Sequence, residues 1–174
     1  GVVTRTSDLT DLGAGRLATV AGRVLGRDIR ITTADLAVTA AGAIGDAATQ
    51  TVDAQVSGNA AVDGRILGQD ILVSAATIGV GATGQVGGAA SNRTELRATG
   101  ATTVDGTVLG SNVVVTAASL GVGGTGAIGE AATQTVNIQV TGNAAVDGRI
   151  LGQDILVSTA TIGVGAPGQV GGAA

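Results

Sequence analysis

The chain has 174 residues and a formal net charge of −4, and it contains no aromatic residue, histidine, methionine or cysteine. The negative charge argues against nucleic-acid binding, because phosphate contacts need clusters of Lys and Arg. Without cysteine the chain has no disulfide and no zinc–thiolate site. A hydrophobic content of 44% with 13% charged residues excludes a disordered chain, so the core must be filled by Val, Ile, Leu and Ala.

A motif of the form Val-x-Gly-x-(Val/Ile)-Leu-Gly occurs four times, starting at Val20, Val62, Val104 and Val146. The starts are 42 residues apart, and a fixed period of this size is typical of a solenoid. We expect one solenoid over residues 1–174, with repeats at approximately 9–50, 51–92, 93–134 and 135–174. Because the array begins and ends inside the pattern, we also expect a fragment of a longer repetitive protein that lacks any export signal.

Apolar residues alternate along each repeat, as the fourth repeat illustrates. Val136, Ile138 and Val140 point to one side of the chain, and two further runs, within 153–158 and 161–164, continue the alternation. Period two predicts strands. Five or six short strands in one repeat favour two coils of about 21 residues, each with three faces, and eight coils give a rod about 40 Å long.

The four copies also indicate which side of the strands is buried. Two positions stay apolar in every copy and are predicted to form the core: Ile29, Ile71, Val113 and Ile155, and Ile31, Val73, Val115 and Val157. The position between them is Arg30 in the first repeat and Leu72, Val114 and Leu156 elsewhere, so we expect it to face solvent. Leu25, Leu67, Leu109 and Leu151 each precede a glycine and are predicted to plug a corner of the coil.

Aspartates occur at one position of three repeats, as Asp63, Asp105 and Asp147, each followed by glycine. Two coils per repeat would separate these like charges by roughly 10 Å, near a Debye length. The Asp-Gly steps are either turns or strand residues whose glycine faces a crowded interior, and the continuing alternation favours the second. The pairs Asp63/Arg65 and Asp147/Arg149 could form a binding stripe, but solvated ion pairs are the expected outcome.

No catalytic, cofactor-binding or metal-binding residue is expected. The Gly-Gly-Ala-Ala segments at 87–90 and 171–174 lack the aspartate of calcium-binding nonapeptide repeats. Thr-Gln-Thr at 49–51 and 133–135, and Thr4-Arg5-Thr6, are interpreted as exposed strand threonines. Asn92-Arg93-Thr94 fits a glycosylation sequon. A polysaccharide hydrolase or lyase would need converging carboxylates, whereas the 13 acidic residues are dispersed, so an enzyme is not expected.

The run AAGAIGDAATQTVDAQVSGNAAVDGRILGQDILVSAA at 40–76, and its partner at 126–160, resemble the shaft repeats of filamentous-haemagglutinin-type bacterial adhesins, which are exported by two-partner secretion. The resemblance implies a right-handed parallel β-helix at the bacterial cell surface or outside the cell. The amino-terminal secretion domain of that family is absent from this sequence. Bactofilin-type cytoskeletal solenoids match less well, and their similarity is limited to the residue pattern of V-D-G-R-I-L-G-Q-D-I.

The leading hypothesis is a structural rod or filament segment of an extracellular adhesin, sheath or fibre. Its partners would be further repeats of the same chain or other copies stacked end to end, because uncapped coils expose backbone groups and apolar layers. The alternative is a solenoid module that binds surface glycans or host receptors. No stretch of about 18 apolar residues is present, so no transmembrane segment is expected.

Overall fold

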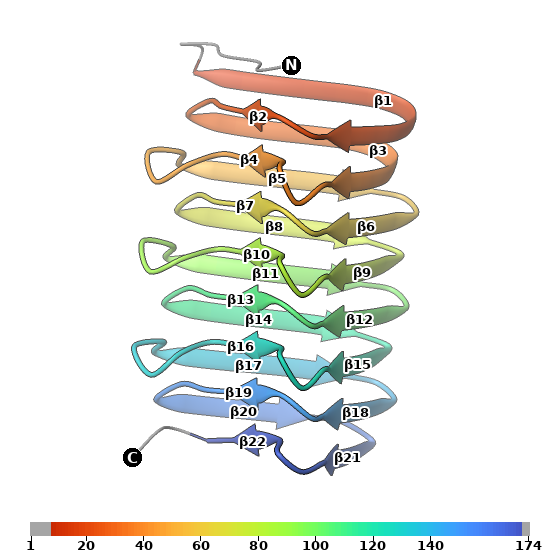
Figure 1. Cartoon of the computed structure of the whole chain (residues 1–174), viewed down its shortest axis with the longest axis vertical. Coiled ribbons are helices and arrows are strands. Elements are labelled where there is room, and N and C mark those ends of the chain that lie inside the picture. Colours follow the sequence, from red (N-terminus) through yellow and green to blue (C-terminus); the bar gives the residue numbers. More distant parts are fainter. Residues whose placement is uncertain (1–7, 172–174) are drawn as a thin grey trace.

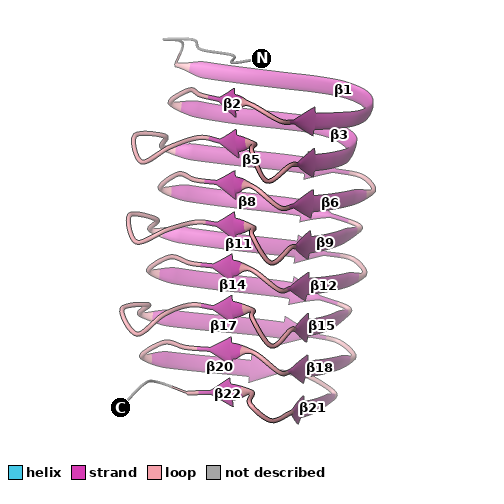
Figure 2. Cartoon of the chain, viewed as in Figure 1, coloured by secondary structure: helices cyan, strands magenta, loops and turns pink. Residues whose placement is uncertain are grey.

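In the computed structural model, residues 8–171 are described, and they form 22 parallel strands with no helix (Figure 2). Each turn of the chain places three strands in succession, so the molecule is a β-solenoid with three faces (Figure 1). The all-β fold predicted from the period-two alternation is confirmed. The strands of one coil run to one side behind and return in front while the chain descends, which makes the helix right-handed (Figure 1).

The first face holds the longest strands. They are β3 (Asp28–Val38), β5 (Thr51–Val56), β8 (Asp70–Ala75), β11 (Arg93–Ala98), β14 (Asn112–Ala117), β17 (Thr135–Val140) and β20 (Asp154–Ser158). At the amino-terminal end β1 (Leu9–Val20) pairs with β3, and both strands continue around the corner onto the second face (Figure 1).

The second and third faces hold shorter strands. The second face contains β6 (Asn59–Val62), β9 (Thr77–Val80), β12 (Ala101–Val104), β15 (Ser119–Val122), β18 (Asn143–Val146) and β21 (Thr161–Val164). The third face is a separate sheet of two-residue strands: β2 (Arg23–Val24), β4 (Ala43–Ile44), β7 (Arg65–Ile66), β10 (Gln85–Val86), β13 (Thr107–Val108), β16 (Ala127–Ile128), β19 (Arg149–Ile150) and β22 (Gln169–Val170). One such strand per coil gives eight coils in the described part.

The two coils of a repeat differ in length. On the first face, Thr51 pairs with Asp70, and Asp70 pairs in turn with Arg93. One repeat therefore consists of a short coil over 51–69 and a long coil over 70–92, and this order recurs along the chain. The prediction of two coils of about 21 residues per repeat is confirmed, and the structure shows that the two coils differ in length by four residues. The long coil carries a loop that projects beside the third face after β4, β10 and β16 (Figure 1).

The core is a continuous aliphatic column along the solenoid axis. Ile29, Ile71 and Val113 are at most 2% exposed, so the first predicted core position is confirmed in these coils. Ile31, Val73 and Val115 are fully buried and confirm the second position. In the last coil Ile155 and Val157 are only partly buried, because no described strand pairs with the outer edge of β20. Such layers of branched side chains on parallel strands supply the main driving force for folding.

Outward positions also follow the prediction. Arg30 and Leu156 are exposed, and Leu72 and Val114 are partly exposed, so the position between the two core positions faces outward as expected.

The corners between the second and third faces depend on glycine. Gly64 and Gly106 occupy two-residue bends, and the alternation of buried and exposed residues continues through them. A Cβ on Gly106 would overlap the carbonyl oxygens of Gly84 and Gly81 in the preceding coil. The close approach of two backbones requires glycine here, as the crowded-interior interpretation predicts.

The corner leucines do not plug the interior. Leu25, Leu67, Leu109 and Leu151 are partly exposed, so the predicted internal position is wrong. Instead, the carbonyl oxygens of Leu25 and Leu109 accept hydrogen bonds from the buried hydroxyls of Thr10 and Thr94, at 3.0 and 2.6 Å. The Leu67 side chain lies beside the base of a projecting loop, near Gly88.

Candidate functional site

The outer side of the first face carries the most varied chemistry of the described chain. Its central column alternates between polar and aliphatic residues from coil to coil, as Asp53, Leu72, Glu95, Val114, Asn137 and Leu156. The polar residues belong to the short coils and the aliphatic ones to the long coils, with Arg30 as the exception. This column therefore repeats at the period of the sequence unit.

A charged cluster lies at the middle of this column, on β11. Arg93, Glu95 and Arg97 are two residues apart along one strand, so all three side chains point outward. Arg93 Nη2 lies 2.6 Å from one carboxylate oxygen of Glu95, and Arg97 Nε donates to the other. We call these three residues the Arg–Glu–Arg cluster.

The cluster keeps its carboxylate almost fully covered. The Glu95 side chain is 8% exposed, whereas the two arginine side chains are 53% and 57% exposed. A carboxylate removed from water needs charged hydrogen-bond donors, and both oxygens of Glu95 have one. The aliphatic neighbours Leu72 and Val114 lie opposite Glu95 on the adjacent strands. The result is a fixed pair of guanidinium groups with one compensating negative charge.

Asp53 and Asn137 occupy the position of Glu95 in the neighbouring repeats, and their side-chain oxygens have fewer hydrogen-bond partners. Asp53 Oδ2 accepts a bond from Gln55 Nε2 at 3.1 Å, but its Oδ1 is buried without a partner. Asn137 Oδ1 is also buried without a partner. Only β11 places arginine two residues before this position, because the other repeats have Leu9, Thr51 and Thr135 there.

Two shallow hollows lie on either side of the central column and share Leu72 as part of their walls. One has a volume of about 460 Å³ and includes Asp53, Asp70 and Arg93. The other has a volume of about 620 Å³ and is lined by hydroxyl and amide groups beside Arg97: Thr32, Gln55, Ser57 and Ser74. Hydroxyl and amide groups around one cation suit a polar ligand that carries a negative charge.

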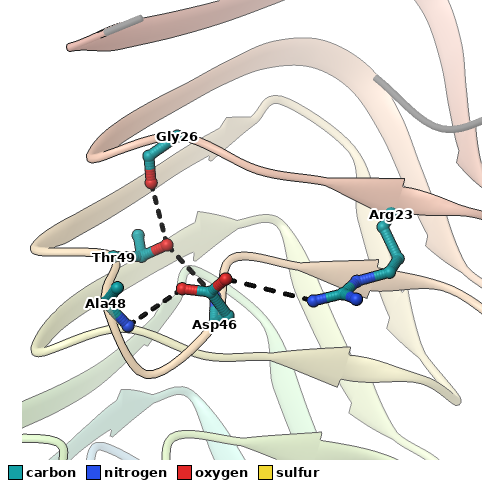
Figure 3. Close-up of polar contacts among 5 residues, drawn as sticks. All are labelled: Arg23, Gly26, Asp46, Ala48 and Thr49. Carbon is teal, nitrogen blue, oxygen red and sulfur yellow. Dashed lines mark hydrogen bonds and ion pairs between the residues drawn. The ribbon is translucent and has the colours of Figure 1, made fainter. Parts of the chain in front are cut away.

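The projecting loops form a second repeated feature. They span 45–50, 87–92 and 129–134, and each contains one buried hydroxyl: Thr49, Ser91 or Thr133. Figure 3 shows the first loop, where Thr49 Oγ1 donates to the carbonyl oxygen of Gly26 at 2.9 Å and accepts from the backbone N–H of Asp46 at 3.1 Å. In the second loop Ser91 makes the same two bonds, to Gly68 and from Gly88.

The aspartate of the first loop has two further contacts. Asp46 Oδ1 accepts from the backbone N–H of Ala48 at 2.9 Å, and Oδ2 lies 3.9 Å from Arg23 Nη2 on the preceding coil (Figure 3). Both side chains of this ion pair are substantially exposed, so it contributes at most a few tenths of a kcal/mol. Among the side-chain contacts of the loop, the buried hydroxyl of Thr49 therefore contributes more to its attachment than the ion pair does.

The threonine prediction is only partly correct. Thr51 and Thr135 are exposed at the starts of strands, but Thr49 and Thr133 are buried anchors of the loops. Thr4-Arg5-Thr6 lies outside the described residues. In the sequon, Asn92 is exposed at the end of a loop, whereas the Thr94 side chain is buried.

The Asp-x-Arg pairs do not come together. Among residues 8–171 no ion pair joins Asp63 to Arg65 or Asp147 to Arg149, so the expected solvated ion pairs are absent there. The Asp63 carboxylate instead lies over Gly81 of the next coil, where a Cβ would stand. Asp105 and Asp147 lie over Gly123 and Gly165 in the same way.

No three acidic residues of the described segment gather closely enough to hold a metal ion. Gly171 closes that segment, and residues 172–174 of the second Gly-Gly-Ala-Ala segment lie outside it. No helix able to cross a bilayer occurs between residues 8 and 171.

Comparison with known proteins gives no further assignment. No protein-family model matches the chain, and neither a curated protein nor a solved structure matches it.

Proposed function

We propose that the chain is a structural segment of a bacterial surface rod or filament, located outside the cell. The observation that supports this most strongly is the stacking of eight coils in one register around an unbroken aliphatic core. Each further repeat would lengthen such a body without changing its cross-section, because a solenoid unit contacts only its neighbours. The resemblance to adhesin shaft repeats supports the extracellular location.

Small-angle X-ray scattering tests the rod. A variant with residues 51–134 duplicated in tandem gains four coils, so its maximum dimension should increase by about 19 Å at an unchanged cross-sectional radius. An increase in the cross-section would contradict growth along one axis.

Antibody labelling of intact source cells tests the location. A purified antibody against the chain should label intact cells, with an antibody against a cytoplasmic protein as the control. Labelling that appears only after lysis would contradict a surface role.

A glycan-binding face is the second candidate function. It is favoured by the hollow of about 620 Å³ beside Arg97, lined by hydroxyl and amide groups. An array of neutral, carboxylated and sulfated glycans should then show binding to acidic glycans that is lost in Arg97→Gln. No binding, or equal binding by the variant, would exclude this face as the glycan site.

A further inference from the structure

The two hollows on the first face differ in charge. The smaller one, of about 460 Å³, includes the carboxylates of Asp53 and Asp70 together with Arg93 and Glu95. Arg93 and Glu95 bind each other, whereas no ion pair among residues 8–171 involves Asp53 or Asp70. Two carboxylates in this hollow therefore lack a cation that compensates their charge.

Asp53 is the more confined of these two carboxylates. Its Oδ2 accepts a hydrogen bond from Gln55 Nε2 at 3.1 Å, and its Oδ1 is covered by protein atoms without any hydrogen-bond partner. Arg30 lies opposite Asp53 on β3, but this arginine is exposed and forms no ion pair with it. A carboxylate oxygen that is removed from water is stabilised most by a charged donor, so the smaller hollow suits a cationic group.

The larger hollow has the opposite character. Arg97 donates to Glu95 through Nε, and its side chain is 57% exposed, so its Nη groups remain for a ligand. No carboxylate of the described chain lines this hollow. Its other polar groups are hydroxyls and amides, among them Gln55 and Ser74. The larger hollow therefore suits an anionic group with hydroxyl groups around it.

Leu72 separates the two hollows and contributes to the wall of both. Asp70 lines the smaller hollow and Ser74 the larger one, and they are four residues, or about 13 Å, apart along β8. The strands β5, β8 and β11 lie side by side at this point (Figure 1). A ligand that fills both hollows must carry its positive and negative groups on different units and pass over an aliphatic side chain between them.

From this division of charge we infer that the first face binds a zwitterionic oligosaccharide. A protonated amine on one sugar lies beside Asp53 and Asp70, and a carboxylate or sulfate on another sugar lies beside Arg97. The inference deepens the glycan-binding candidate and rests on it. A peptide with the same charges fits less well, because extended peptides dock on an open sheet edge, whereas β8 is hydrogen-bonded to β5 and β11 along both of its edges.

The fourth repeat supplies a matched control position. Asp154 occupies the place of Asp70 there, but Asn137 stands where the second repeat has Asp53. An amide carries no charge, so the pair of carboxylates is not repeated at Asp154. Replacing Asp154 therefore removes the same charge from the same strand position without touching the inferred site.

Surface plasmon resonance with an immobilised oligosaccharide tests the charge pairing. The probe alternates glucosamine with glucuronic acid and is prepared with free amines and, as the reference, with acetylated amines. Below neutral pH the chain should bind the free-amine form about tenfold more tightly, because only this form offers a charged donor to the two carboxylates. Equal affinity for the two forms would overturn the inference. If Arg97→Gln abolished that equal binding, the acidic-glycan face itself would stand.

Carboxamide variants identify the residues that recognise the amine. Asp53→Asn combined with Asp70→Asn should lose the preference for the free amine and still bind the acetylated form, which shows that the variant is folded. Asp70→Asn alone, at an exposed position, should reduce the preference at least threefold, and Asp154→Asn should bind both forms as the parent does.

Two results would contradict the assignment in different ways. A preference for the free amine that persists in the double variant would overturn the inferred site. Failure of the parent to bind either form would overturn both this inference and the glycan-binding candidate. Neither result affects the growth of the rod along one axis, which scattering measures separately.

Discussion

The hydroxyl of Thr49 donates a hydrogen bond to the carbonyl oxygen of Gly26 at 2.9 Å and so ties a projecting loop to the preceding coil. The bond runs from the end of a long coil to the end of the short coil before it. The same hydroxyl accepts a hydrogen bond from the backbone N–H of Asp46, so it also pairs a backbone donor within the loop. This buried side chain therefore adds to the backbone hydrogen bonds, from Gly45 to Val24 and from Gln50 to Arg27, that attach the loop to the preceding coil.

Replacing this anchor should destabilise the fold without changing its shape. Thr49→Val preserves the side-chain volume but leaves the Gly26 carbonyl and the Asp46 N–H unpaired, so we expect a loss of about 1–3 kcal/mol. The measurement is urea unfolding followed by circular dichroism. Thr116→Val, at an exposed first-face position, is the control and should change stability by less than about 0.5 kcal/mol. Equal effects would contradict the anchor role.

The Arg–Glu–Arg cluster should respond asymmetrically to substitution. Arg93→Ala with Arg97→Ala leaves the buried Glu95 carboxylate without its two donors, so we expect a loss of roughly 1–3 kcal/mol after allowing for the exposure of both arginines. Glu95→Leu removes the charge and reproduces the aliphatic residue found at Leu72, so it should be neutral within about 1 kcal/mol.

Urea unfolding of both variants and of the parent checks this ordering. If Glu95→Leu lowers the free energy of unfolding as much as the double arginine variant does, the ion pairs themselves stabilise the fold, and the expected asymmetry is wrong.

The effect of replacing a glycine by alanine on stability should depend on the space around that glycine. Gly106→Ala places a methyl group against the carbonyl oxygens of Gly84 and Gly81, which belong to backbone and cannot move aside, so we expect a loss of about 3 kcal/mol or more. Gly163→Ala, in β21, meets no atom within 4 Å and should be neutral or slightly stabilising. Thermal unfolding of the two variants distinguishes them, and similar melting temperatures would contradict the crowded corner.

The sequence predicts the strands and the core well because both follow a single local rule. The four copies identify Ile71 and Val73 as inward residues, because an inward position must stay apolar in every coil whereas an outward position can hold Arg30. The unequal coil lengths were not predicted. Coil length depends on where the chain turns at each corner. The position of a turn changes the alternation of apolar and polar residues very little, so the pattern does not predict it.

The candidate site was harder to predict for a related reason. Thr49 and Thr51 stand two residues apart in one Thr-Gln-Thr segment, yet one is buried in a loop and the other is exposed at a strand start. A usable signal was present in the hydroxyl residue that recurs at 49, 91 and 133, once in each of the first three repeats. The Arg93–Glu95–Arg97 spacing also predicts three side chains on one strand face, but only packing against Leu72 and Val114 buries the central one.

Deleting whole repeats should be tolerated better than deleting single coils. Removal of residues 51–92 joins a long coil to the short coil that starts at Arg93, so the alternation and every remaining loop anchor are retained. Removal of residues 51–69 places two long coils together, brings their projecting loops to about 4.8 Å spacing and deprives Ser91 of the Gly68 carbonyl. We expect the first deletion to unfold cooperatively with a strand-rich circular dichroism spectrum. The second should unfold at a lower urea concentration even though it keeps more residues, and the reverse order would show that coil alternation contributes nothing to stability.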